Sequence, residues 1–341
     1  GSGHDRASRR RRAVSVADEV LAVRRGAGLF ELADRGLLEI AGGDARRWLN
    51  GMVSNYVALL REGPERSGCR ALVLSNKGRV LAELHVLLVG EAFWLELPRA
   101  SAEPIAERLG RFVIDDVRIA DRSADDARFG VEGPAAGRAL EGALGGGPLA
   151  LADGSCGRRT ADGAEVAVAR FGWSGEEAYQ LFVPEASRES VQARLVEVAV
   201  PCSLESLEVL RVEAGRPRWG AELSEDVLPP EARLEGAISY TKGCYTGQEI
   251  VARLRSRGHV NHILVGLRFD GAAPPAPGVR LRAAKAEIGE VTSAVRSPVA
   301  GAIGLGFVRV GHDAPGTLLD AGGRTAHVAA LPLVPPTGPL P

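Results

Sequence analysis

The strongest chemical signal in the sequence is segment 242–249, which reads Lys-Gly-Cys-Tyr-Thr-Gly-Gln-Glu. Its cysteine, Cys244, follows Lys242 by two residues and precedes a stretch with helical spacing. A nearby ammonium group and the positive end of a helix both stabilise a thiolate, the form of cysteine that attacks electrophiles and binds soft metals. We therefore predict that Cys244 is an exposed working thiol with Lys242 beside it. The alternative is a small buried residue in a turn, which is common for an isolated cysteine.

A short helix is needed to place this thiol. Thr246 and Glu249 have the spacing of a capping box, so the helix is predicted to begin with Thr246 as its N-cap. Apolar residues then recur at helical spacing, and Gly258 is typical of a helix end. This arrangement directs the unpaired N–H groups of the first turn toward Cys244.

A second set of polar side chains lies on the strand predicted at residues 80–89. Strict alternation puts Glu83 and His85 on one face of this strand among aliphatic residues, whereas the other face is entirely aliphatic. A face with a carboxylate and an imidazole is typical of a strand that faces a ligand. It is equally typical of a half-exposed strand, and both interpretations stay open at this point.

Composition places the chain among soluble globular proteins, with 45% hydrophobic and 25% charged residues. Its 341 residues exceed what one ordinary core organises, so two or three domains are expected. The formal net charge of −1 creates no general attraction to nucleic acid or to acidic membranes. No apolar run approaches the ~20 residues that span a bilayer, and no secretory signal is visible. A cytoplasmic location without nucleic-acid or membrane partners is therefore predicted.

The cysteines stand far apart, at positions 69, 156, 202 and 244. No C-x-x-C pair occurs, which argues against a zinc site or an iron–sulfur cluster held by this chain alone. Such sparse use fits a reducing compartment better than a disulfide framework. We therefore predict no resident metal.

The order of strand and helix patterns, together with the family resemblance described below, indicates an α+β fold with three lobes, of which two are α/β lobes and the third is a small C-terminal β-barrel. Strand and helix patterns alternate up to Gly258, and short strands divided by Gly and Pro follow it. The predicted divisions are a disordered basic tail at 1–24, a discontinuous first lobe at 25–95 with 200–258, an inserted lobe at 96–199, the barrel at 259–333 and a proline-rich tail at 334–341.

Five segments resemble, in order, the motifs of one protein family. Segment 242–249 is similar to the K-G-C-Y-x-G-Q-E signature of the YgfZ family. These proteins are folate-binding relatives of the glycine-cleavage T-protein (aminomethyltransferase) and act in iron–sulfur protein maturation. T-proteins tend to carry an Asp-Phe pair where this chain has Cys244-Tyr245, so the motif favours YgfZ. The other similar segments are 43–50, 131–136, 172–176 and 211–217.

The resemblance implies a T-protein-like architecture with tetrahydrofolate bound among the lobes. Glu176 is expected to accept the N–H groups of the pterin edge, and Arg211 is expected near the carboxylates of the folate tail. Each residue also has a purely structural interpretation. Glu176 could belong to a solvated turn, and Arg211 could pair with Glu208 or Glu205 on a helix. The remaining residues expected around the folate are Glu83, Trp173, Tyr245 and Gln248.

One position departs from the T-protein pattern. T-proteins carry an Asp-Asp pair on the strand where this chain has Ala82-Glu83. Because acid–base catalysis needs a carboxylate within hydrogen-bond reach of the reacting atom, this change argues against aminomethyl transfer but not against folate binding. Three functions stay open. The first is a factor that assembles or repairs iron–sulfur proteins, with client proteins or the assembly machinery as partners. The others are a folate-dependent aminomethyltransferase and a non-catalytic folate-sensing protein.

Overall fold

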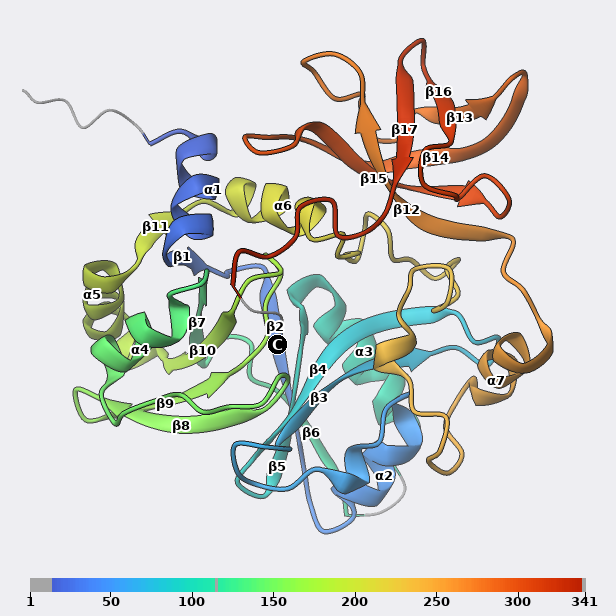
Figure 1. The fold of residues 1–341 in the computed structure, drawn as a ribbon. Coiled ribbons are helices and arrows are strands. Elements are labelled where there is room, and N and C mark those ends of the chain that lie inside the picture. The colour runs from blue at the N-terminus through green and yellow to red at the C-terminus, as the bar shows by residue number, and fades with distance from the viewer. Residues whose placement is uncertain (1–13, 114–115, 339–341) are drawn as a thin grey trace, which may run out of the picture.

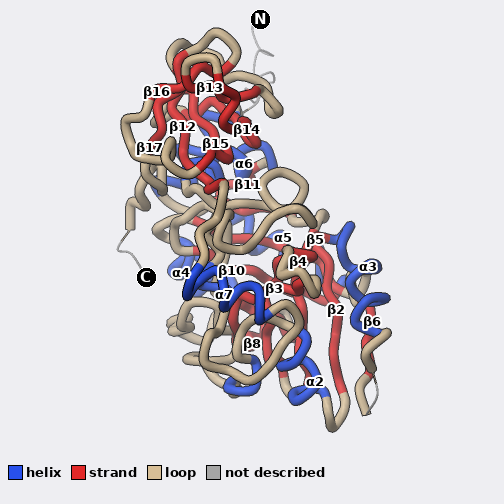
Figure 2. Tube along the Cα trace, turned by 90° about the vertical axis from the view of Figure 1, so that its right-hand side faces the viewer, coloured by secondary structure: helices blue, strands red, loops and turns tan. Residues whose placement is uncertain are grey.

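The computed structural model describes residues 14–113 and 116–338 and consists of three lobes. Two sheet-containing lobes lie side by side, and a small closed barrel stands over them (Figure 1). Figure 2 shows the barrel strands gathered at one end of the molecule. The predicted fold class, an α+β chain with two α/β lobes and a C-terminal β-barrel, is confirmed. Within the described ranges, no helix is long and apolar enough to cross a membrane.

Antiparallel strands form the first sheet. They are β2 (Arg35–Ala41), β3 (Gly68–Leu74), β4 (Val80–Val89), β5 (Ala92–Pro98) and β6 (Arg118–Asp121). Their order in the sheet is β3-β4-β5-β2-β6. Alternation along each strand gives the sheet one aliphatic face, against which α2 (Ala45–Met52) and α3 (Arg99–Gly110) pack. The opposite face is turned toward the neighbouring lobe.

The second sheet combines strands from distant parts of the chain. They are β1 (Gly28–Glu31), β7 (Asp126–Glu132), β8 (Cys156–Ala161), β9 (Ala164–Ala169), β10 (Ala178–Pro184) and β11 (Val200–Cys202). Their order is β11-β1-β7-β10-β9-β8, and β1 pairs with β11 in parallel. Helices α4 (Ala136–Leu144) and α5 (Arg188–Val198) cover the outer face of this sheet (Figure 1) and bury an aliphatic core against it.

The barrel closes on itself and so has no open sheet edge. Its strands are β12 (His262–Phe269), β13 (Arg280–Ala283), β14 (Ala286–Ser297), β15 (Gly301–Arg309), β16 (Leu318–Ala321) and β17 (Thr325–Ala329). Helix α6 (Leu204–Glu213) connects the barrel to the lobes, because it packs against β14 and β15 and also against α1 (Val16–Arg25). The remaining elements are α7 (Gln248–Arg257) and the 3-10 turns η1 (Val57–Leu59), η2 (Glu185–Ser187) and η3 (Glu235–Ala237).

The two sheets face each other across a layer that is partly apolar and partly charged. Leu87 of β4 packs there with Phe171 and Phe182 of the second lobe. Alternation along β4 places Glu83 and His85 on the same side as Leu87, so both polar residues enter this layer. This face is therefore turned inward between the lobes, which contradicts the interpretation of β4 as a half-exposed strand.

Strand pairing divides the chain differently from the predicted boundaries. Helix α1 occupies residues 16–25, most of which fall in the predicted tail of 1–24. Strand β1 belongs to the second sheet, although residues 25–95 were assigned to the first lobe, and β6 belongs to the first sheet, although residues 96–199 were assigned to the inserted lobe. The pairing partners of these short strands lie far away in sequence, so local patterns do not reveal them. Residues 1–13 and 339–341 of the two predicted tails lie outside the described residues.

Candidate functional site

The signature segment forms a loop in front of α7 whose burial alternates. Lys242 and Tyr245 are buried, with 5% and 7% exposure, whereas Gly243 and Cys244 are exposed. Tyr245 packs in an apolar cluster with Leu72 of β3. The two buried side chains anchor the loop and leave Cys244 facing solvent.

The ammonium group of Lys242 is bound to the backbone of the first lobe. Its Nζ donates to the carbonyl oxygens of Asn50 (2.5 Å), Val53 (2.6 Å) and Asn55 (2.8 Å), at the C-terminal end of α2. An ammonium has three N–H bonds, so these contacts leave none for the sulfur of Cys244. Burial lowers the pKa of Lys242 to about 8. Lys242 thus anchors the loop and does not act as a hydrogen-bond partner of the Cys244 thiol.

Replacing Lys242 with methionine is expected to lower the free energy of unfolding by about 2–4 kcal/mol, because three carbonyl oxygens inside the protein lose a charged donor. Urea unfolding followed by tryptophan fluorescence measures this change. Lys285→Met is the matched control, since Lys285 is exposed in the turn between β13 and β14 and is expected to contribute less than about 0.5 kcal/mol. Equal effects of the two substitutions would contradict an anchoring role for Lys242.

The predicted capping box before α7 is wrong. The helix begins at Gln248, its N-cap is Gly247, and no side chain caps it. Gly247 has a φ of 83°, and a Cβ there would lie 2.6 Å from the carbonyl oxygen of Ser75, so this position requires glycine. The close contact of Gly247 with the β3–β4 hairpin sets where the helix starts and overrides the local capping signal of Thr246. Cys244 consequently lies three residues before the N-cap.

Cys244 differs from the other cysteines in its environment. Cys156 is buried, Cys69 and Cys202 are half-buried, and Cys244 is exposed. Burial raises the pKa of Cys69 and of Cys202 to about 12, and it also raises the pKa of Cys156. Near neutral pH these three thiols are held in the protonated form. Cys244 is the thiol that a partner molecule can reach.

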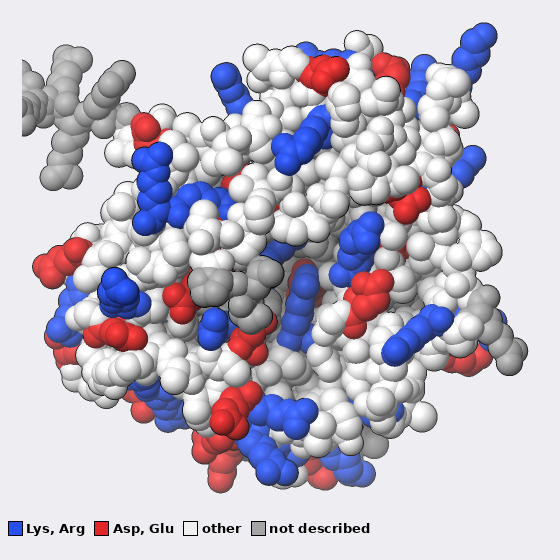
Figure 3. Space-filling view, viewed as in Figure 1, with Lys and Arg blue, Asp and Glu red and all other residues white. Residues whose placement is uncertain are grey.

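A charged layer crosses the middle of the molecule between the two lobes. The register of the first sheet aligns Arg70 on β3, His85 on β4 and Glu96 on β5, so their side chains point to the same face. Glu83, two residues from His85 on β4, forms an ion pair with Arg70. Basic and acidic side chains gather around a hollow between the lobes and the barrel in Figure 3. Within this layer the carboxylate of Glu83 is already paired with Arg70.

Glu96 is held tightly within this layer. Its oxygens accept hydrogen bonds from Arg35 at 2.5 and 3.0 Å, and Nδ1 of His85 lies 3.5 Å away. Burial by itself raises the pKa of Glu96, but the charge of Arg35 and hydrogen bonds from His85 and Arg35 outweigh it and lower the pKa to about 2. The ring of His85 stacks on Phe171 with centroids 3.7 Å apart, and burial lowers the pKa of this imidazole. His85 is therefore a neutral ring between a carboxylate and an aromatic side chain.

A cavity of about 290 Å³ opens beside the charged layer. The guanidinium of Arg35 lies over the ring of Trp173, 4.9 Å from its centroid. The turn that carries Trp173 is fixed by Glu132, which accepts hydrogen bonds from the backbone N–H groups of Trp173 and Ser174 at 3.1 and 2.7 Å. Two of the residues expected around a folate line this cavity. Its walls include Leu32, Arg35, Trp173, Leu207, Arg211 and Arg218.

Arg211 is buried, and its hydrogen-bond donors are all in use. Two of its N–H groups donate to Glu208 at 2.7 and 2.5 Å. The others donate to Glu222 (2.9 Å), Ser293 (2.6 Å) and the carbonyl oxygen of Arg216 (3.0 Å). A guanidinium has five N–H bonds, so none remains for a folate carboxylate. These contacts support the structural interpretation, in which Arg211 pairs with Glu208 and connects α6 to the barrel.

Glu176 does not line this cavity but belongs to a buried ion-pair cluster. Its carboxylate accepts a hydrogen bond from Arg24 at 2.6 Å, and Arg24 also donates to Glu213 at 2.5 and 3.1 Å. The backbone N–H of Thr337 lies 3.0 Å from both carboxylate oxygens of Glu176. The interpretation of Glu176 as part of a solvated turn is wrong, because its side chain is 0% exposed.

The predicted site residues thus lie in separate places. Trp173 and Arg211 share the cavity, Glu83 lies in the charged layer, and Glu176 lies beneath the C-terminal segment. The signature segment holds the other four, with Lys242, Cys244 and Tyr245 in the loop and Gln248 at the start of α7.

Sequence reasoning missed several residues of these clusters. Arg35 and Glu96 are 61 residues apart in the chain, and Arg24 and Glu213 are 189 residues apart. A single sequence does not show which residues pair over such distances, although Glu213 falls within the similar segment 211–217. The polar face of β4 was the one signal that pointed to the charged layer.

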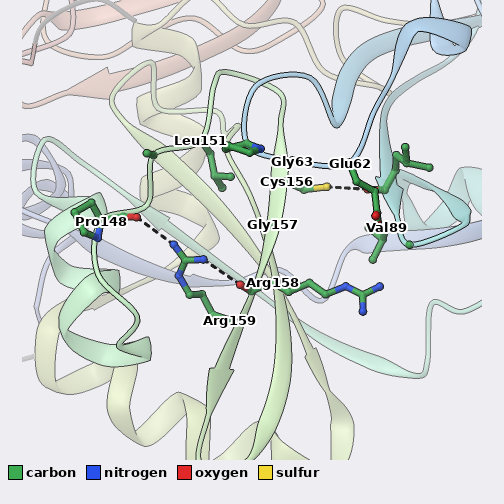
Figure 4. A pocket seen from close by; sticks show the side chains of 13 residues that line it. Glu62, Gly63, Val89, Pro148, Leu151, Cys156, Gly157, Arg158 and Arg159 are labelled. Atoms are coloured by element: carbon green, nitrogen blue, oxygen red, sulfur yellow. Dashed lines mark hydrogen bonds between the residues drawn. The ribbon is translucent and has the colours of Figure 1, made fainter.

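Another cavity, of about 440 Å³, lies between the edges of the two sheets (Figure 4). The thiol of Cys156 is turned there toward the carbonyl oxygen of Leu88 at 3.4 Å, and Arg159 donates to the carbonyl oxygen of Pro148 at 3.1 Å. None of the predicted site residues lines this cavity. It therefore carries none of the chemistry expected from the sequence.

Two family models match the chain. Residues 4–242 match the GCVT N-terminal domain, and residues 263–337 match the glycine cleavage T-protein C-terminal barrel domain. The chain is similar to the aminomethyltransferase of Rubrobacter xylanophilus, with 34% identity over 291 residues that cover 84% of this chain and 77% of that protein. It is also similar to the aminomethyltransferase of Streptomyces avermitilis, with 33% identity over 317 residues that cover 89% of this chain and 84% of that protein.

The crystal structure of glycine cleavage system aminomethyltransferase T from Bartonella henselae has the same fold. The TM-score is 0.85, and the match covers 95% of this chain and 91% of that one at 23% sequence identity. The arrangement of two sheet-containing lobes and a C-terminal barrel is therefore shared with a solved structure.

Proposed function

Since this chain belongs to the glycine cleavage T-protein family, we propose that it binds tetrahydrofolate and serves the assembly or repair of iron–sulfur proteins. The exposed thiol of Cys244 is the observation that carries this proposal. Iron–sulfur client proteins or the machinery that assembles their clusters are the proposed partners. The resemblance of segment 242–249 to the YgfZ signature supports the same assignment.

The cavity beside the charged layer has features that suit a folate. A pterin is a flat ring that can stack on Trp173, and a volume of about 290 Å³ suits the ring rather than the whole molecule. The guanidinium of Arg216 is half-buried and forms no hydrogen bond within the described residues. Burial and the charge of Arg70 lower the pKa of Arg216. Arg216 does not line the cavity, and the carboxylates of Glu132, Asp153 and Glu83 partly offset its charge. Because its guanidinium N–H groups have no hydrogen-bond acceptor within the described residues, we propose Arg216 rather than Arg211 as the partner of a folate tail that extends beyond the cavity.

The thiol supports a role at iron–sulfur clusters because thiolates are the ligands that such clusters use. Cys244 stands on a loop that Lys242 and Tyr245 hold in place. Such an anchored loop presents the sulfur to a partner without the entropy cost of ordering a free segment. We therefore place the contact with the partner at this loop.

Aminomethyl transfer is the second candidate function, and the names of the relatives favour it. The chemistry of the site favours it less. Where T-proteins carry their Asp-Asp pair, this chain has Glu83, whose carboxylate is ion-paired with Arg70. This ion pair occupies the carboxylate that acid–base catalysis would need within reach of the reacting atom. We therefore propose a folate-dependent factor rather than a transferase.

Calorimetric titration of the full chain with tetrahydrofolate tests the ligand. Binding of one folate per chain is expected, and Trp173→Ala is expected to weaken it about tenfold, because loss of an aromatic stack amounts to about 1.4 kcal/mol. Trp173→Phe keeps an aromatic face and serves as the control, with a change of less than about threefold. Absence of binding by the full chain would refute the proposed ligand. Equal affinity of Trp173→Ala and the parent would refute the site.

A further inference from the structure

The last described residues, 331–338, form a strap that runs from the barrel back to the second lobe (Figure 1). Leu333 anchors the strap in the apolar cluster between α6 and the barrel. Arg268 donates to the carbonyl oxygen of Leu333 at 2.6 Å, and the N–H of Val334 donates to the carbonyl oxygen of Glu213 at 3.0 Å. The strap is therefore fixed by packing and hydrogen bonds as far as Val334.

Beyond Val334 the strap is held by polar contacts with Glu176 and with Arg24, whose carbonyl oxygen lies 3.0 Å from the hydroxyl of Thr337. Residues 335–338 are exposed or half-buried. The N–H of Thr337 lies 3.0 Å from both oxygens of Glu176, and its hydroxyl lies 3.1 Å from Oε2. The N–H of Gly338 lies 3.4 Å from Oε2. Because no apolar side chain is buried here, this end can leave its place without opening the core.

Glu176 needs hydrogen-bond donors whether or not the strap supplies them. Glu176 and Glu213 are both buried and share the guanidinium of Arg24. Two carboxylates with one cation leave an excess of negative charge, which is unfavourable in a buried cluster unless further donors stabilise it. Ser297 donates to Glu213 at 2.5 Å, and the strap donates to Glu176. Any molecule that displaces the strap has to bring N–H or O–H donors of its own.

A pterin edge has the required chemistry, since an amide-like N–H stands beside an amine. Trp173, which lines the cavity, stands three residues before Glu176 in the same turn, whereas Glu176 itself is covered by the strap and does not line the cavity. We propose that residues 335–338 occupy Glu176 in the ligand-free protein and that the N–H donors of the ligand displace them. This inference rests on the proposed folate-binding function. It makes the strap an intrachain competitor of the folate.

A chain that ends at Val334 tests the competition, because it keeps the Leu333 anchor and loses the donors. The apparent affinity for tetrahydrofolate falls as the strap occupies Glu176 in a larger fraction of the molecules. Removal of the strap is therefore expected to lower the dissociation constant for tetrahydrofolate at least about tenfold. Thr337→Pro is the second variant, since it removes the N–H and the hydroxyl from a full-length chain and is expected to act in the same direction. Thr337→Ser keeps both donors and is the matched control with unchanged affinity.

Amide hydrogen exchange gives a second readout in the unmodified chain. Saturating tetrahydrofolate is expected to speed exchange at Thr337 and Gly338 at least about tenfold, because released amides lose their protection. Slower or unchanged exchange at these amides would overturn the strap inference. So would an affinity for tetrahydrofolate that is equal or weaker in both the shortened chain and Thr337→Pro. In either case, folate binding by the full chain would still uphold the proposed function. Absence of folate binding in every variant would overturn both.

Discussion

Cys244→Ala is expected to fold and to bind tetrahydrofolate like the parent, yet to lose at least about 90% of the ability to restore iron–sulfur enzyme activity in cells that lack the equivalent factor. The side chain of Cys244 is exposed, and the loop is held by its neighbours. Exchange of one small side chain for another at such a position changes the free energy of unfolding by less than about 0.5 kcal/mol. The measurement is the activity of an iron–sulfur enzyme in extracts of the complemented cells.

Cys202→Ala is the control for this experiment, because it removes a half-buried thiol whose pKa is raised to about 12 by burial. It is expected to restore activity like the parent. Full restoration by Cys244→Ala would show that the thiol is dispensable and would leave a folate-sensing protein as the better assignment. Unfolding of Cys244→Ala would support the structural interpretation of this cysteine.

Arg211→Met is expected to lower the free energy of unfolding by about 3–5 kcal/mol. The substitution removes the guanidinium but leaves the buried carboxylate of Glu222 without its cation, and an uncompensated buried charge is strongly destabilising. It also releases Ser293 and so weakens the contact of α6 with the barrel. Urea unfolding of the full chain measures the loss.

Arg218→Met provides the comparison, because Arg218 also pairs with Glu208 but at the surface, with half of its side chain exposed. Surface ion pairs contribute about 1 kcal/mol or less, so this variant is expected to differ little from the parent. If both variants lost the same small amount, the role of Arg211 as a link between α6 and the barrel would be contradicted. A loss confined to Arg211→Met also argues that this arginine is structural rather than a folate ligand.

Features set by neighbouring residues could be predicted from the sequence. Ser203 is a typical N-cap residue before the helical spacing of α6, and its side chain accepts a hydrogen bond from the N–H of Ser206. Strand β12 lies in the part of the chain after Gly258 where short strands divided by Gly and Pro were expected. Alternation along β4 correctly separated the aliphatic face from the face that carries Glu83. These signals work because hydrophobic period and capping act over a few residues.

Features that depend on distant contacts could not be predicted. The capping box at Thr246 failed because Gly247 fits against the β3–β4 hairpin, about 170 residues earlier in the chain. The partner of Glu176 in the strap is 161 residues away. Pairing of Arg211 with Glu208 was one of the interpretations that the sequence offered, but its contacts with Glu222 and Ser293 could not be foreseen. Predictions from residue type and local spacing were therefore more reliable than predictions of which residues contact each other.

The most direct test of the proposed function is the activity of an iron–sulfur enzyme in cells that lack the equivalent factor and express the full chain. Restored activity, compared with cells that carry an empty vector, is the predicted result. Unrestored activity from a chain that is folded and binds tetrahydrofolate would contradict the role in iron–sulfur protein assembly or repair.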